Sequence, residues 1–130
     1  MKVLGAMFVT LLCVACTPFV PVVNLKQVPQ SDLAASMDIQ IYTIDSSASH
    51  PPIEKVLGDI TSYSCKFLPT DPPASKGDAL KQLRYKAWQL HANAIVDVTF
   101  DTRGMDAFGT NCYESVQASG QAVLLRATNK

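Results

Sequence analysis

The chain opens with an apolar block behind a single basic residue. Residues 3–15 are almost all apolar and follow Lys2. This block is too short for a permanent membrane-spanning helix, which needs about 20 residues. Its length and its basic start are typical of an export signal. We therefore predict a signal peptide at residues 1–15.

The next stretch, residues 17–37, contains three prolines and several polar residues and shows no sustained hydrophobic period. Proline fixes its own backbone angle and removes a hydrogen-bond donor. We predict that residues 16–37 form the modified N-terminus and a flexible linker, followed by a globular domain at 38–130. Val20, Val22 and Val23 are more apolar than a spacer requires. A linker that contacts a partner is therefore the alternative to a disordered stalk.

Four later segments have the composition or the alternation of β-strands. Residues 38–44 and 55–65 are rich in β-branched and aromatic residues and are separated by a proline-bearing loop. In residues 94–100 and 113–125, apolar and small side chains alternate with polar ones. On one face of the first of these strands the alternation places Ala94, Val96, Val98 and Phe100. On one face of the second it places Val116, Ala118, Gly120, Ala122 and Leu124.

Between the second and third strands lies the segment with a clear helical period. Ser75, with Asp78 three residues later, resembles a capping box, and we expect Asn93 to be left-handed at the helix exit. Trp88 is expected to pack in or beside the core, with ligand stacking as the alternative. The apolar stripe consists of Leu80, Leu83, Ala87 and Leu90.

These elements predict an α+β fold. We expect a small antiparallel or mixed four-stranded sheet with one main helix packed on it. The small residues of the last strand would let that helix approach closely, so we place the helix across the last two strands.

The charge balance restricts the partners. The chain carries 11 basic and 11 acidic residues. Without a basic excess to neutralise phosphates, we expect no nucleic-acid partner. Polybasic attraction to anionic lipids is absent as well, so membrane attachment would need a covalent lipid or an apolar segment.

A covalent lipid is indicated by the tetrapeptide Cys13–Cys16, which resembles a lipobox. Ala15 suits the cleavage position, and Cys16 would become the acylated first residue. Thr17 follows, and the absence of Asp there favours sorting to the outer membrane in a Gram-negative bacterium. We predict a lipid-anchored protein whose domain lies in the periplasm or at the cell surface. An ordinary secretory signal is the alternative.

Two cysteines remain after Cys16, namely Cys65 and Cys112. In an oxidising compartment we expect them to form a disulfide. Its role is open between a structural bond and a redox-regulated one. A metal site is less supported, because His50 and His91 do not lie at a ligand spacing from either cysteine.

No catalytic motif is present in the sequence. Asp97, Asp101 and Asp106 could be read as an acidic cluster, but strand alternation already places the first and second on a solvated face. We expect His91 at the helix end, where a cation is favoured. We therefore expect neither enzymatic activity nor a cofactor.

Several short runs, in this order, resemble the RcsF family of outer-membrane lipoproteins. These runs are Ile41–Thr43, Gly58–Ile60 with Ser64–Cys65, Ala92–Val96, Asn111–Tyr113 and Ser119–Ala122. The helix and the strand after it also resemble the wider YbjQ-like fold. The resemblance covers most of residues 38–125.

The resemblance implies a Cys65–Cys112 disulfide between the second strand and the last loop. The family has a second disulfide, whose positions fall at Phe100 and Ala118 here. The 103–111 loop is expanded, and the linker is shorter and less basic than in the family.

For function, the resemblance implies a sensor of envelope stress that signals to a Rcs-type phosphorelay through protein–protein contacts. The implied partners are the barrel-assembly machinery, outer-membrane β-barrels and an IgaA-like inner-membrane regulator. The first alternative is a structural outer-membrane lipoprotein of the same fold without a phosphorelay role. The second is a small enzyme or ligand carrier, which would need a pocket with converging polar groups.

Overall fold

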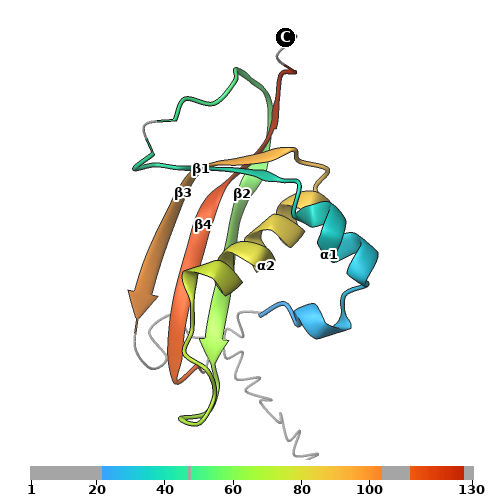
Figure 1. Ribbon diagram of the computed structural model, residues 1–130. Helices are drawn as coiled ribbons and strands as arrows, with labels where there is room; N and C mark the ends of the chain where they lie inside the picture. The colour runs from blue at the N-terminus through green and yellow to red at the C-terminus, as the bar shows by residue number, and fades with distance from the viewer. Residues whose placement is uncertain (1–21, 47, 104–111, 128–130) are drawn as a thin grey trace, which may run out of the picture.

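The computed structural model describes residues 22–46, 48–103 and 112–127. They form the predicted α+β fold, a four-stranded mixed sheet with a long helix across one face and a shorter helix beside it (Figure 1). In chain order, the elements are the 3₁₀ turn η1 (Leu25–Gln27), α1 (Gln30–Ser36), β1 (Gln40–Thr43), β2 (Ile53–Lys66), α2 (Lys76–Gln89), β3 (Ala94–Arg103) and β4 (Glu114–Leu125).

The strand order in the sheet is β1-β3-β4-β2. The short edge strand β1 is parallel to β3, whereas β4 runs antiparallel to both β3 and β2. The antiparallel pairing of β2 with β4 is the longest in the sheet. Each of the four predicted strands is present, with bounds that differ by a few residues from those expected.

Strand β3 changes face in its middle, so the prediction that its four apolar residues share one face is wrong. Its pairing with β4 skips between Val96 and Thr99, and Asp97 has a left-handed φ of 54°. This bulge resets the alternation. Ile95, Val98 and Phe100 therefore belong to the core under α2. A second cluster holds Ala94, Val96, Val123 and Leu125.

The core under α2 includes small residues on both the helix and the sheet. Ala79, Leu83 and Ala87 are fully buried on the helix, and Ala118 and Ala122 are fully buried on β4. The predicted close approach of helix and sheet is therefore present, but α2 lies mainly over β2 and β4, not over β3 and β4 as predicted. Of the predicted stripe, Leu83 and Ala87 are buried as expected, whereas Leu90 follows the last residue of α2 and is 42% exposed. Trp88 is half-buried against this core, as expected.

The expected left-handed residue at the end of α2 is His91, not Asn93. His91 has a φ of 60°, its amide donates to the Trp88 carbonyl at 2.9 Å, and the Ala92 amide donates to the Ala87 carbonyl at 3.0 Å. These two bonds define a Schellman ending.

Asn93 has a different use. Its side-chain amide accepts from the Leu125 amide at 2.8 Å and donates to the Leu125 carbonyl at 3.0 Å. The side chain thus makes the pair of hydrogen bonds that a backbone segment of a neighbouring strand would make with Leu125, at the end of β4.

Residues 22–37 of the segment predicted as a flexible linker contain regular structure. Within it, η1 and α1 form, and α1 packs on α2. The buried Ser36 donates to the Leu33 carbonyl at 2.7 Å, and Arg84 of α2 donates to the Ile39 carbonyl at 3.2 Å. A helix of seven residues is too short for a sequence period to reveal it. We call residues 22–37 the N-terminal segment.

Candidate functional site

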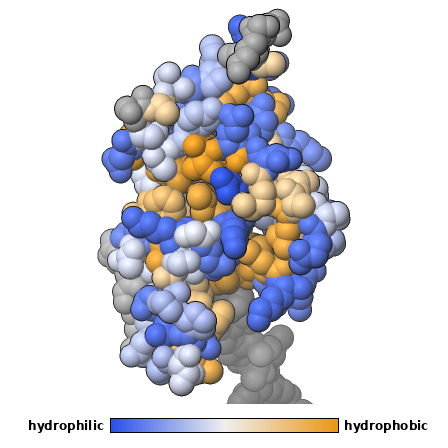
Figure 2. All heavy atoms as spheres, in the orientation of Figure 1, coloured by the Kyte–Doolittle hydropathy of each residue, from blue (hydrophilic) through white to orange (hydrophobic). Residues whose placement is uncertain are grey.

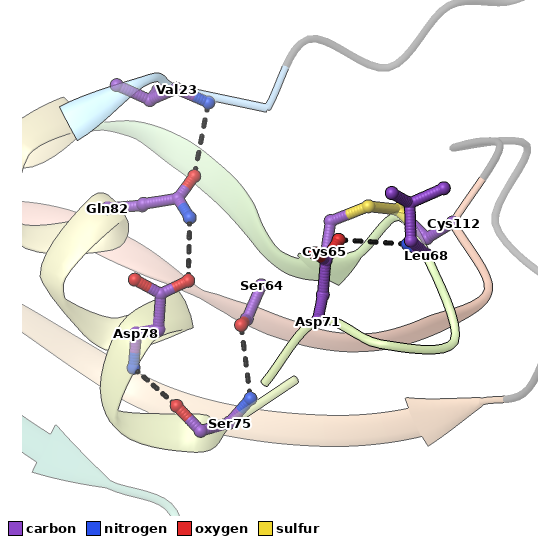
Figure 3. The surroundings of a disulfide bond; sticks show 9 residues. All are labelled: Val23, Ser64, Cys65, Leu68, Asp71, Ser75, Asp78, Gln82 and Cys112. Atoms are coloured by element: carbon purple, nitrogen blue, oxygen red, sulfur yellow. Dashed lines mark hydrogen bonds between the residues drawn. A yellow bond between two sulfur atoms is a disulfide. The ribbon is translucent and has the colours of Figure 1, made fainter. Parts of the chain in front are cut away.

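The Cys65–Cys112 disulfide predicted from the sequence is present, at the end of the sheet where β2 finishes and β4 begins (Figure 3). The two Cα atoms are 5.5 Å apart. Cys112 is fully buried, and the next residue, Tyr113, donates its amide to the Lys66 carbonyl at 2.7 Å. The bond therefore joins two chain segments at the point where their backbone pairing starts. We call this region the disulfide end.

A tight turn follows β2 at the disulfide end. The Leu68 amide donates to the Asp71 carboxylate at 2.9 Å, and the Asp71 amide donates back to the Leu68 carbonyl at 3.0 Å. This reciprocal pair fixes the turn (Figure 3). Phe67 and Leu68 nevertheless remain exposed.

A series of hydrogen bonds connects β2, the start of α2 and the N-terminal segment (Figure 3). The Ser64 hydroxyl accepts from the Ser75 amide at 3.1 Å, and the Ser75 hydroxyl caps α2 by accepting from the Asp78 amide at 3.1 Å. Gln82 donates to the Asp78 carboxylate at 3.2 Å. Its carbonyl oxygen accepts from the Val23 amide at 3.1 Å. The predicted Ser75 cap is therefore the start of a longer connection.

A groove of about 660 Å³ lies between the N-terminal segment and the disulfide end. Residues 22–26 form one wall, the end of β2 and the loop after it form the other, and Gln82 lies between them. Ser64, Ser75 and Gln82 use their polar atoms for bonds within the protein. These polar atoms are therefore already engaged within the fold.

Apolar atoms also run along the face that bears α2. In Figure 2, drawn from the same side as Figure 1, hydrophobic residues occupy the middle of this face and hydrophilic residues flank them. The half-buried Val22, Val23, Leu25, Val28 and Leu33 belong to the N-terminal segment. The apolar residues noted in the predicted linker are thus partly buried against the rest of the domain.

Two partly buried groups, one on β2 and one beside it, have shifted pKa values. Burial raises the pKa of the Tyr63 hydroxyl above its usual value. Burial also lowers the pKa of Lys86 on α2, whose ammonium group donates to the Thr61 carbonyl. In each case the low-dielectric surroundings favour the neutral form.

Phe100 and Ala118, the positions that the resemblance assigns to a second disulfide, are cross-strand partners on β3 and β4. Side chains at directly opposed positions have Cβ atoms about 4.5–5.5 Å apart, close to the separation that a disulfide needs. Here the Phe100 ring and the Ala118 methyl group pack into the core under α2 instead. The Lys76 ammonium lies 5.3 Å from the centre of the Phe100 ring.

Other sequence candidates do not meet in the described part of the chain. His50 packs edge-on against Tyr42, while His91 lies exposed at the end of α2. Asp97 and Asp101 are exposed on β3, as strand alternation predicts for them. Within residues 22–46, 48–103 and 112–127, no group of His, Cys, Asp or Glu side chains could hold a metal ion. Cys16, Asp106 and the loop at 104–111 lie outside the described residues.

Sequence reasoning missed the contact between Gln82 and Val23, which are 59 residues apart. Gln82 is 3% exposed, although a glutamine on a helix is normally placed on the solvent side. The only sequence signal was the cluster of valines in the linker. It indicated a contact without indicating its partner.

No protein-family model matches the chain, and no curated protein matches it. Among solved structures, one similar chain is a DUF74-family protein of unknown function from Pediococcus pentosaceus, with 17% identity and a TM-score of 0.45. The alignment covers 68% of this chain and 98% of the other. Among the described helices, none is long and apolar enough to cross a membrane.

Proposed function

We propose that this protein is a lipid-anchored signalling protein of the RcsF type, which senses envelope stress through protein–protein contacts outside the cytoplasm. The Cys65–Cys112 disulfide is the observation that carries the proposal. Stable disulfides belong to oxidising compartments, and the export signal with acylation at Cys16 would take the chain to one. The proposal includes no catalytic step and no cofactor.

The cross-strand position of Phe100 and Ala118 supports the resemblance independently of the cysteines. Two positions 18 residues apart in sequence were assigned to one disulfide by alignment alone. In the fold they lie directly opposite each other, where such a bond could form. A wrong alignment has little reason to place them there.

The N-terminal segment controls how far the domain can move from its anchor. Val22 lies six positions after Cys16, and a fully extended chain of that length spans about 20 Å. If residues 22–37 detach from α2, the reach to Asp38 becomes about 75 Å. Packing of this segment on α2 therefore holds the domain near the membrane, and its release extends the domain toward the opposite membrane.

In the proposed mechanism, two partners compete for the domain. At the outer membrane it engages the barrel-assembly machinery and outer-membrane β-barrels. Envelope damage weakens that engagement, and the domain then contacts an IgaA-like regulator of the inner membrane. The partner that is available decides which population of the domain predominates.

The test combines chemistry and genetics. Mass spectrometry of the membrane-extracted protein should find acyl groups on Cys16. Deletion of the gene should abolish the response of a phosphorelay reporter to lipopolysaccharide damage, and the wild-type chain should restore it. A photocrosslinking amino acid at the exposed Gln27 should capture the partners, with the exposed Gln89 as the control position. An unchanged reporter together with unchanged crosslinks to barrel proteins would exclude the signalling role.

A structural outer-membrane lipoprotein with the same fold is the second candidate. The short reach from Val22 favours it, because a domain whose N-terminal segment stays on α2 remains at the membrane. This candidate predicts crosslinks from position 27 to envelope proteins before and after damage, and no effect of the deletion on the reporter.

A further inference from the structure

Three large apolar side chains are exposed together at the disulfide end. Phe67 is 59% exposed, Leu68 is 58% exposed and Tyr113 is 45% exposed. Phe67 and Leu68 follow β2 directly, and the Tyr113 amide is bonded to the Lys66 carbonyl. We call these three residues the apolar rim. Exposed apolar residues are common singly, whereas a contiguous group of them marks an interaction surface.

Backbone hydrogen bonds and the disulfide determine the exposed position of the apolar rim. The reciprocal Leu68–Asp71 hydrogen bonds hold the turn, and the disulfide holds Tyr113 beside it. The Asp71 carboxylate is turned toward the Leu68 amide rather than outward from the rim (Figure 3). The rim residues thus stay in place in water instead of folding back onto the core.

The proposed lipid anchor at Cys16 indicates what the apolar rim would contact. Val22 and Phe67 line the same groove, and Cys16 lies only about 20 Å of extended chain before Val22. Strand β2, with 14 residues, carries the opposite end of the sheet about 46 Å away. The end of β4 also lies at that opposite end, where Leu125 pairs with Ile53 (Figure 1). If Cys16 is acylated, as the proposed function holds, the disulfide end faces the lipid.

The chemistry of the rim suits a lipid headgroup layer. Tyrosine places an apolar ring beside a hydroxyl group, which is why it is frequent at membrane interfaces. The Lys66 ammonium lies 5.6 Å from the centre of the Tyr113 ring, where a long basic side chain can bury its stem and keep its charge in the headgroup region. We propose that Phe67, Leu68 and Tyr113 dock in the boundary between headgroups and acyl chains of the membrane that carries the anchor.

The test measures the depth of a single tryptophan in membrane-bound protein. Trp88→Phe removes the native indole, and Phe67→Trp places one in the rim. The chain is purified with its acyl groups, or is coupled through Cys16 to a maleimide phospholipid, in vesicles of phosphatidylethanolamine and phosphatidylglycerol. With brominated lipids, the indole at position 67 should lose most of its emission. Leu68→Trp serves as the second rim variant if Phe67→Trp does not fold.

The matched control is Ile53→Trp in the same background. Ile53 is an exposed apolar residue at the opposite end of β2, and an indole there should keep its emission. An indole at position 67 that iodide quenches and bromolipid does not would overturn the proposal. So would an indole protected from both quenchers, because protein would then cover the rim. Since the maleimide lipid replaces cellular acylation, these outcomes are independent of whether the cell acylates Cys16 or signals through this protein.

Discussion

At the scale of single residues, two serines show how much a hydrogen-bond partner matters in this sheet. Ser62 and Ser115 are both fully buried. The Ser62 hydroxyl donates to the Ala79 carbonyl of α2 at 2.6 Å, whereas the Ser115 hydroxyl has no partner in the described part of the chain. A buried polar group without a partner keeps its desolvation cost without compensation.

We therefore expect opposite results from the same substitution. Ser62→Ala should lower the free energy of unfolding by about 1 kcal/mol, because it removes a satisfied buried bond. Ser115→Ala should leave it unchanged or raise it by up to about 1 kcal/mol. Urea unfolding followed by circular dichroism measures both values. Equal losses in the two variants would contradict this assignment of partners.

The two partly buried titratable groups, Tyr63 and Lys86, predict opposite pH dependences of stability. The pKa of Tyr63 is raised on folding, so its contribution is fully present below pH 10, the ordinary tyrosine value, and is lost as the pH rises through the folded pKa. The pKa of Lys86 is lowered on folding, so stability is regained as the pH rises through its folded value toward about 10.4.

These effects oppose each other in the wild-type protein and can be separated by substitution. Between pH 8 and pH 11, the stability of the wild type relative to Tyr63→Phe should fall, and relative to Lys86→Met it should rise. Thermal unfolding at several pH values gives both differences. A difference that stays flat would show that the group concerned titrates alike in the folded and unfolded chain.

At the scale of elements, the contact between β3 and β4 depends on a missing side chain. Gly120 of β4 lies opposite the bulge of β3. A Cβ atom there would come within 2.7 Å of the Ile95 side chain, 3.0 Å of the Val98 side chain and 3.1 Å of the Val96 carbonyl. From the sequence, we attributed this glycine to the close approach of the helix. In the fold, it is the neighbouring strand that requires it.

Gly120→Ala should therefore lower the free energy of unfolding by about 1–3 kcal/mol, because the buried β-branched neighbours have little room to move. Gly77→Ala on α2 is the control, since a Cβ atom at Gly77 meets nothing within 4 Å. That change should raise the stability by about 0.5–1 kcal/mol through helix propensity. Denaturant unfolding of both variants checks the difference in sign.

The N-terminal segment is a second element whose stability rests on few contacts. Gln82→Ala removes the acceptor of the Val23 amide. A net loss of about 1 kcal/mol corresponds to roughly fivefold faster hydrogen exchange at that amide. Gln89→Ala, at an exposed position on the same helix, is the control and should leave the exchange rate as it is. Unchanged protection of Val23 in the Gln82 variant would mean that α1 alone holds the segment.

At the scale of the whole molecule, one covalent bond closes a large part of the domain. The cysteines are separated by 47 positions, and the loop between them includes α2 and β3. In the chain-entropy model, a loop of this length contributes about 4 kcal/mol. Small domains have stabilities of about 5–15 kcal/mol, so the bond supports a large share of the fold.

The Cys65→Ala/Cys112→Ala double variant should therefore lose about 4 kcal/mol of unfolding free energy. Reduction of the wild-type protein should produce a similar loss, and a reductant should have no effect on the double variant. Urea unfolding with and without the reductant compares the four samples. A loss below about 1 kcal/mol would assign the bond to redox regulation rather than to stability.

The sequence by itself determined the features that depend on neighbouring residues or on intrinsic chemistry. Residue composition and alternation predicted the four strands, the helical period and the Ser75 cap predicted α2, and the two cysteines predicted their own pairing. These features are readable because each depends on local periodicity or on the bond-forming chemistry of one residue type.

The tertiary structure alone decided the features that depend on residues distant in the chain. The bulge of β3 needs Gly120 on another strand, and the N-terminal segment needs Gln82, which lies 59 residues after its partner Val23. The outward position of Phe67 and Leu68 is set by the turn and by the disulfide beside it. No local pattern records such contacts, because packing and burial are settled only when the whole chain has folded.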